Sequence, residues 1–251
     1  MSGGRTFTLG GRRTALEAVR AGLAIEVLVA REARGTPGLR ELTAAAAEAG
    51  TRVREVDRTE LDRLAPDHHG VVARVRPTPE LRERALATWP FADDAVVVAL
   101  DGVDDPQNLG AAARSAEAAG AAMLVTRTHR AAPVTPAAIR ASAGALLHLP
   151  HARVANIGRA LERLRDDAGF TVVGLDEKAE RTVYDEPAPE GRIAIVLGSE
   201  AEGLGRLTRE ACDFLVSLPM RGRIGSLNAS ASLAAVLFAY VVPRGPAPSG
   251  R

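Results

Sequence analysis

The sequence has 251 residues, of which 46% are hydrophobic, 25% charged and 3% aromatic, with a formal net charge of +1. The hydrophobic share is sufficient for a core and argues against intrinsic disorder. The scarcity of aromatic residues argues against an RNA-binding module that stacks bases on many rings. The single cysteine, Cys212, excludes an internal disulfide and a cysteine-rich zinc site.

The first residues, MSGGRTFTLGGRR, lack the apolar stretch of a signal peptide. No apolar run approaches the ~20 residues that cross a bilayer. We therefore expect a soluble, cytoplasmic protein without a membrane partner.

Residues 1–76 have the pattern of a small α/β domain. Hydrophobic periodicity and β-branched runs separate its helices from its strands. The predicted helices are 14–21 and 38–49, and the predicted strands are 25–30, 52–56 and 70–75. Residues 77–94 contain three prolines among charged residues, which indicates a linker with a short helix over 80–88.

Strands and helices alternate from residue 95 to residue 243, which predicts a parallel sheet with helices on both faces. The apolar run Ala95–Leu100 is typical of a strand covered on both sides. The further predicted strands are 121–125, 170–174, 193–197 and 214–218, and the predicted helices include 108–119 and 228–240. Residues 244–251 are predicted to form a disordered tail.

Common nucleotide-binding signatures are absent from the sequence. No GxGxxG follows a strand, and no GxxxxGK[ST] occurs. A dinucleotide-binding fold therefore has no support, and neither does the common class of methyltransferase with a Gly-rich loop after its first strand.

Two polar segments follow apolar strands, where open α/β sheets bind their ligands. In Leu100–Gly120, Asn108 can cap the helix, and Arg114 can reach back toward the loop because side chains tilt toward a helix N-terminus. In Ile193–Glu210, glycines let the backbone approach a ligand, and Glu200 is the carboxylate inside the turn. Taken singly, each segment is also compatible with an ordinary cap or turn.

A third segment, Val216–Tyr240, joins an apolar strand to an apolar helix. Ser226 or Asn228 can cap that helix. A cap alone does not explain why two arginines, two glycines and three small polar side chains lie between these apolar elements.

In this order and spacing, the three segments resemble the motifs of the SpoU-type branch of the SPOUT RNA methyltransferases. The matching residues are Asn108 with Arg114, Gly198-Ser199-Glu200 with Gly203, and Pro219-Met220 followed by Ser226-Leu227-Asn228 and Ser230. The segments GGRRTALEAVRAG and DHHGVVARV are similar to the L30e-like domain that precedes the catalytic domain in many members. The chain is most similar to bacterial enzymes that methylate a guanosine ribose of 23S rRNA, although His69 stands where that subfamily usually has glutamine.

The resemblance implies a ribose 2′-O-methyltransferase that uses S-adenosylmethionine and no metal. It also implies a deep C-terminal trefoil knot and a homodimer whose active sites draw on both subunits. The implied cofactor-binding residues are Leu197, Gly198, Ser199, Gly203, Leu218, Pro219, Met220 and Leu227. The implied catalytic residues are Asn108, Arg114, Glu200, Ser226 and Asn228, and our candidates for RNA contact in the small domain are Arg12, Arg13, His68 and Arg74.

The role of Arg114 stays open between two possibilities. Family proposals make it the proton acceptor, but a guanidinium group normally stays protonated, and a bound phosphate favours that charged form further. It can instead clamp the phosphate of the target nucleotide with its fork of N–H groups. The target is also open, because a resistance methyltransferase or a tRNA methyltransferase of this family fits the same segments. The small domain alone would permit a non-catalytic RNA-binding protein, but the three intact motifs argue against that alternative.

Overall fold

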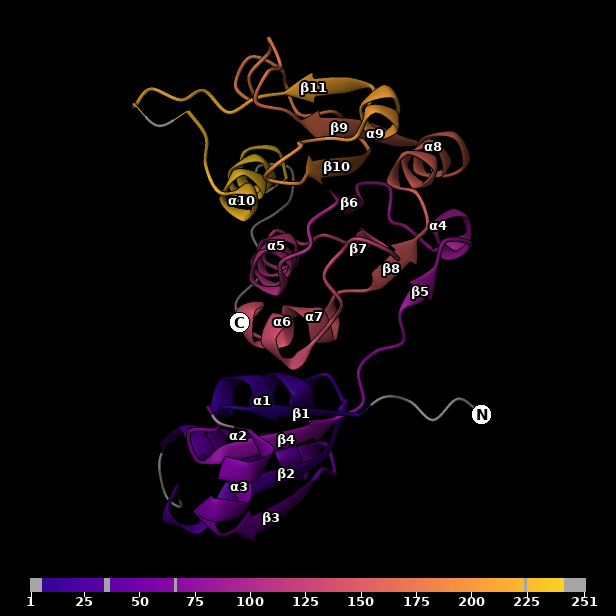
Figure 1. Ribbon diagram of the computed structural model, residues 1–251. Coiled ribbons are helices and arrows are strands. Elements are labelled where there is room, and N and C mark those ends of the chain that lie inside the picture. The colour runs from indigo at the N-terminus through magenta and orange to yellow at the C-terminus, as the bar shows by residue number, and fades with distance from the viewer. Residues whose placement is uncertain (1–5, 34–36, 66, 224, 242–251) are drawn as a thin grey trace. The chain divides into compact units, whose positions relative to one another are not determined.

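The computed structural model describes residues 6–33, 37–65, 67–223 and 225–241. They form two compact units (Figure 1). The first holds the described residues up to Pro79 together with Val134–His148, and the second holds Glu80–Pro133 and the described residues from Leu149 on. Within these ranges, no helix is long and apolar enough to cross a membrane.

The first unit is built on a four-stranded sheet with the order β1-β4-β2-β3. β4 is antiparallel to β1 and β2, whereas β2 and β3 are parallel. The strands are β1 (Phe7–Gly10), β2 (Ala24–Ala30), β3 (Arg52–Val56) and β4 (Val71–Val75). The helices are α1 (Arg12–Arg20), the 3-10 turn η1 (Arg31–Ala33), α2 (Pro37–Glu48), α3 (Arg58–Leu64), α6 (Pro136–Ala141) and α7 (Ala145–His148).

The predicted helices and strands of this unit are confirmed, but β1, η1, α3, α6 and α7 were not predicted. β1 has only four residues, and α3 (RTELDRL) has too few apolar residues for its periodicity to stand out. Leu61 of α3 is nevertheless fully buried against Leu28, Val56 and Val72.

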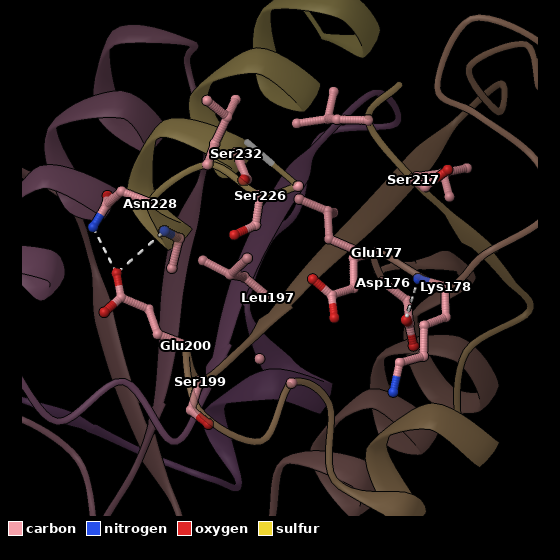
Figure 2. Close-up of a pocket in the computed structure, with 18 of the residues that line it drawn as sticks. Asp176, Glu177, Lys178, Leu197, Ser199, Glu200, Ser217, Ser226, Asn228 and Ser232 are labelled. Carbon is pink, nitrogen blue, oxygen red and sulfur yellow. Dashed lines mark hydrogen bonds between the residues drawn. The ribbon is translucent and has the colours of Figure 1, made fainter. Parts of the chain in front are cut away.

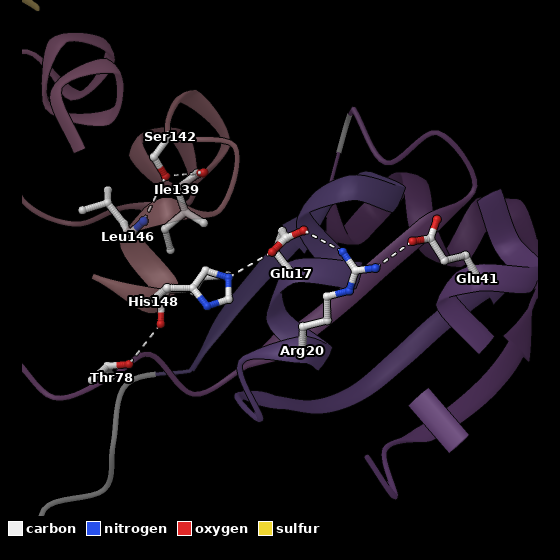
Figure 3. A network of polar contacts seen from close by, with 9 residues as sticks. Glu17, Arg20, Glu41, Thr78, Ile139, Ser142, Leu146 and His148 are labelled. Carbon is white, nitrogen blue, oxygen red and sulfur yellow. Dashed lines mark hydrogen bonds and ion pairs between the residues drawn. The ribbon is translucent and has the colours of Figure 1, made fainter. Parts of the chain in front are cut away.

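α6 and α7 belong to the first unit although they lie between two strands of the second unit's sheet in sequence. His148 Nε2 lies 3.0 Å from Glu17 Oε2, and Arg20 joins Glu17 to Glu41 of α2 (Figure 3). Thr78 donates a hydrogen bond to the Leu147 carbonyl. The domain boundaries at 76, 94 and 243 stay predictions.

The second unit contains a seven-stranded sheet with the order β11-β9-β10-β6-β7-β8-β5, and every pairing is parallel. Its strands are β5 (Leu81–Arg82), β6 (Val96–Asp101), β7 (Met123–Arg127), β8 (His151–Val154), β9 (Phe170–Leu175), β10 (Arg192–Gly198) and β11 (Phe214–Val216). All six residues of β6 are buried, as expected for a strand covered on both faces. The predicted parallel sheet is confirmed.

Helices cover both faces of this sheet (Figure 1), with α5 and α10 on one face and α8 on the other. The helices are α4 (Ala85–Thr88), α5 (Pro106–Ala118), α8 (Ile157–Ala168), α9 (Arg206–Glu210) and α10 (Ala229–Tyr240). α8 begins at the Asn156 cap and ends at Gly169, which has a left-handed φ of 69°. It buries Ile157, Leu161 and Leu164, and each such side chain contributes about 1.5–3 kcal/mol.

The segment predicted as a linker contributes to the second unit. Its short helix is α4, whose Leu86 is fully buried, and its β5 pairs with β8. The predicted tail, 244–251, lies outside the described residues.

Candidate active site

A pocket of about 670 Å³ lies at the carboxyl ends of β9, β10 and β11 (Figure 2). This edge of a parallel sheet is where ligands bind, and the volume lies within the roughly 300–1,000 Å³ typical of small-molecule sites. Three segments line most of it: Leu175–Lys178, Leu197–Gly203, and the connection from β11 to α10. All eight residues predicted to contact the cofactor line this one pocket, and their part in binding stays a prediction.

A closed turn after β10 forms one wall of the pocket. Ser199 and Gly203 exchange two backbone hydrogen bonds, of 3.2 and 2.9 Å, and Ser199 Oγ accepts a hydrogen bond from the Glu202 amide. A Cβ atom on Gly198 would lie 2.1 Å from the carbonyl carbon of Gly203, so only glycine fits there. Gly203 itself has a φ of 67°, which favours glycine as well.

Asp101 holds this turn against β6. Its side chain is almost fully buried at the end of the strand, and Oδ2 accepts a hydrogen bond of 3.1 Å from the Gly205 amide. Oδ1 lies 3.1 Å from Nε of Arg127, at the end of the neighbouring β7. Sequence reasoning missed both residues, because the contact that defines the role of Asp101 joins positions 104 residues apart.

A polar cluster joins the three sequence motifs on one side of the pocket, and Figure 2 shows its Glu200 and Asn228 side chains. Asn228 Nδ2 donates to Glu200 Oε1 at 2.6 Å and to Asn108 Oδ1 at 3.0 Å. Asn228 Oδ1 accepts from the Ser230 amide at 3.0 Å, so the same side chain caps α10. Asn228 therefore caps α10, as predicted, and also joins the three motifs.

The predicted helix cap at Asn108 is wrong. α5 begins at Pro106, and its cap is Asp105, whose carboxylate accepts a hydrogen bond of 3.0 Å from the Asn108 amide. An acidic cap followed by proline is a common helix start. The Asn108 side chain is consequently left to meet Asn228.

The other predicted catalytic residues are less connected. Ser226 lines the pocket. Arg114 is exposed on α5 and outside the pocket lining, and it has no hydrogen bond or ion pair with the described residues. Arg221 and Arg223 are exposed beside the pocket, and nothing in the structure assigns them a role.

The pocket is acidic overall. Its ionisable side chains are the carboxylates of Asp176, Glu177, Glu200 and Glu202 and the cations of Lys178 and Arg209. Four negative and two positive groups favour a ligand that carries positive charge.

The thiol of Cys212 is not poised for chemistry. Burial raises the pKa of Cys212 to about 12, so its thiol stays protonated and unreactive. The described residues contain no group of three His, Cys, Asp or Glu that could hold a metal ion.

The four candidates for RNA contact in the first unit differ in exposure. Arg12 and Arg13 are exposed at the start of α1, and Arg74 is half exposed and lies 3.7 Å from Glu26. His68 is only 1% exposed; its Nδ1 accepts from the Gly70 amide, and its Nε2 lies 2.8 Å from Asp62. The burial of His68 argues against the predicted contact with RNA, because both ring nitrogens already have partners within the first unit.

Comparisons with known proteins agree with this geometry. Residues 95–238 match the model of the SpoU rRNA Methylase family, and residues 8–81 match the model for RNA 2'-O ribose methyltransferase substrate binding. An uncharacterized tRNA/rRNA methyltransferase of Mycolicibacterium vanbaalenii is 42% identical, over 90% of this chain and 73% of its own length. The 23S rRNA (guanosine-2'-O-)-methyltransferase RlmB of Pseudomonas putida is 39% identical, over 85% of this chain and 86% of its own.

Among solved structures, the SpoU methyltransferase AviRb from Streptomyces viridochromogenes in complex with AdoMet is similar with a TM-score of 0.76. The sequence identity is 31%, and the match covers 95% of this chain and 90% of that one.

Proposed function

Because the chain belongs to the SpoU rRNA methylase family, it is an S-adenosylmethionine-dependent RNA 2′-O-methyltransferase, and we propose that its target is a guanosine of 23S rRNA. The observation that most supports the methyl-transfer reaction is the convergence of Asn108, Glu200 and Asn228 beside the pocket. The pocket also fits the cofactor, since its volume suits a small molecule and its excess of carboxylates suits a sulfonium ion.

The reaction forms a bond from the ribose oxygen to the methyl carbon, breaks the bond from that carbon to sulfur, and releases the hydroxyl proton. The enzyme has to hold the three atoms in line and receive or share the proton. Glu200 Oε1 is occupied by Asn228 Nδ2 and lies 3.4 Å from the Ala229 amide. Glu200 Oε2 has no hydrogen bond to the described residues, and we assign it to the ribose hydroxyl of the target nucleotide.

We assign Arg114 to the active site of the partner subunit in a homodimer. Two observations support this: Arg114 stands outside the pocket of its own chain, and α10 (ASASLAAVLFAY) has no charged residue and exposes Phe238. A helix that is apolar on all sides favours burial against a partner. In that position Arg114 would hold the phosphate of the target nucleotide, or take the hydroxyl proton.

The trefoil knot and the L30e-like form of the first unit are part of the proposal. The chain leaves β10 near the middle of the sheet, forms β11 at its edge, and returns to α10, which packs on α5. The connection between β9 and β10 forms hydrogen bonds with the residue after β11 and with the last residue of α10. The Val183 amide donates to the Ser217 carbonyl, and the Tyr240 hydroxyl donates to the Glu186 carbonyl. Such ties are expected where a chain passes through a loop. A cytoplasmic location would follow from a ribosomal RNA target.

The test is to map 2′-O-methyl groups in rRNA and tRNA from cells with and without this protein. Loss of one guanosine methyl group in 23S rRNA, restored by the purified enzyme, supports the proposal. If the missing methyl group lies at another rRNA position or in tRNA, the proposed target is wrong but the proposed reaction stands. If no methyl group changes and calorimetry detects no S-adenosylmethionine binding, the chain is a non-catalytic RNA-binding protein.

A further inference from the structure

Several contacts hold the turn after β9, and they occupy the carboxylate of its first residue, Asp176. The Asp176 amide donates to the Val216 carbonyl at 3.0 Å, and Asp176 Oδ1 accepts from the Lys178 amide at 2.9 Å. Asp176 Oδ2 forms an ion pair with Arg209. The side chain of Asp176 is only 5% exposed. These contacts fix the backbone that carries the next residue, Glu177.

Glu177 lines the pocket and has no hydrogen bond or ion pair with any residue in the described ranges. It stands across the pocket from Glu200 and Asn228, with Leu197 and Ser226 between them in the view of Figure 2. An exposed carboxylate on a fixed turn, facing a ligand pocket, is available to the ligand.

The chemistry of the cofactor limits which of its groups Glu177 can meet. The methyl group has to lie at the Glu200 and Asn228 end, where the RNA ribose arrives. The cofactor's ribose is one carbon from the same sulfur, and the flat adenine suits the apolar lining that Leu197, Leu218 and Leu227 contribute. The donors left for a carboxylate are the two ribose hydroxyls, the ammonium group of the amino-acid end and the amino group at the edge of adenine.

The position of Glu177 in the sheet favours the ribose. In dinucleotide-binding folds, a carboxylate close to the carboxyl end of a strand in the parallel sheet binds ribose hydroxyls, while the phosphates lie over another strand of that sheet. Here β9 and β10 are parallel neighbours, the glycine turn follows β10, and Glu177 comes two residues after the end of β9. We infer that Glu177 binds the 2′- and 3′-hydroxyl groups of the cofactor's ribose.

The inference rests on the cofactor assignment, and its test needs no catalysis. Calorimetric binding of S-adenosylhomocysteine is compared for the parent chain, Glu177→Gln and Glu202→Gln. Glu202 is the matched control, because it is another pocket carboxylate without a side-chain partner among the residues described. We expect Glu177→Gln to weaken binding about 10-fold or more, because charge-assisted hydrogen bonds are lost, and Glu202→Gln to change it by less than about twofold.

Ligand variants then identify the group that Glu177 meets. 5′-Methylthioadenosine lacks the amino-acid end, so Glu177→Gln should weaken its binding by the same factor. The parent should bind the 2′-deoxy form of this ligand more weakly than 5′-methylthioadenosine itself. In Glu177→Gln the two ligands should bind almost equally, because the carboxylate that accepts from the 2′-hydroxyl has been removed. Unchanged far-UV circular dichroism and thermal midpoint confirm that the variants fold.

Two results would overturn the inference. One is parent-like binding of S-adenosylhomocysteine by Glu177→Gln. The other is a loss restricted to S-adenosylhomocysteine, which would assign Glu177 to the ammonium group. Failure of the parent chain to bind S-adenosylhomocysteine would instead contradict the cofactor assignment itself.

Discussion

Asn228 Nδ2 lies 2.6 Å from Glu200 Oε1, and this hydrogen bond joins the start of α10 to the glycine turn after β10. Two segments that are 28 residues apart thus meet at one atom of one carboxylate. The same asparagine caps α10, so its contribution to stability and its contribution to the active site can be separated only by a substitution that keeps one and removes the other.

Asn228→Ser makes that separation. Serine can cap α10 but cannot reach Glu200, whereas Asn228→Ala also removes the cap, which costs about 0.5–2 kcal/mol. We expect both variants to lose about 100-fold in single-turnover methyl transfer because the reacting groups are misplaced. Only the alanine variant should unfold at a clearly lower urea concentration. Parent-like methyl transfer by Asn228→Ser would show that the link to Glu200 is not needed.

Gly198→Ala should open the turn that forms one pocket wall. The new Cβ would lie 2.1 Å from the Gly203 carbonyl carbon, so the backbone has to shift, at a cost of about 1–3 kcal/mol. Calorimetry should find at least about tenfold weaker S-adenosylhomocysteine binding, equivalent to about 1.4 kcal/mol. Gly222→Ala is the control, because a Cβ there meets nothing within 4 Å, and it should bind as the parent does.

Subunit mixing tests the assignment of Arg114 to the partner's site. Arg114→Ala and Glu200→Gln are each expected to be inactive as purified dimers. After the two variants are unfolded together and refolded, mixed dimers contain one site with both native residues. About a quarter of the parent activity should return, because half of the dimers are mixed and one of their two sites is intact. If no activity returns from dimers shown to be mixed, Arg114 acts within its own subunit.

His151 predicts a dependence of stability on pH. Burial, with a smaller contribution from the charge of Arg153, lowers the pKa of His151 from 6.5 to about 4. Between these values the unfolded chain binds a proton and the native one does not, so stability falls as the pH decreases from 6.5 to 4. The loss attributable to this side chain is about 3 kcal/mol, at about 1.4 kcal/mol for each pH unit.

Urea unfolding at several pH values measures this loss. His151→Gln should flatten the profile between pH 6.5 and 4, whereas His129→Gln, at an exposed position, should leave it unchanged. An equally steep profile in His151→Gln would assign the acid sensitivity to other groups.

The fold could be predicted where burial left a pattern in the sequence. The run of β6 is apolar almost throughout, and α5 and α10 carry enough apolar residues to be recognised between strands. β8 (HARV) could not be predicted, because two of its four residues are His151 and Arg153, and nothing in the sequence indicates that His151 is buried beside Thr126. A short strand with polar letters has no periodicity to detect.

The resemblance supplied the candidate residues that the structure brings to one pocket, whereas residues defined only by tertiary contacts were missed. Asp101 is an ordinary strand end until Gly205, 104 residues later, donates to it. His68 was predicted as a candidate for RNA contact in the small domain, but only the fold reveals that the ring is buried against Asp62. Pairings across such distances leave no local pattern.

The order in which the pocket's residues occur along the chain has a consequence during translation. Every segment that lines the pocket comes after residue 174, and Ser232 of α10 is among the lining residues. A nascent chain that has emerged only to β10 has most of the seven-stranded sheet but not the connection from β11 to α10. In the proposed site, the cofactor can stabilise only chains whose α10 has left the ribosome, so we expect its binding only after this unit has been synthesised.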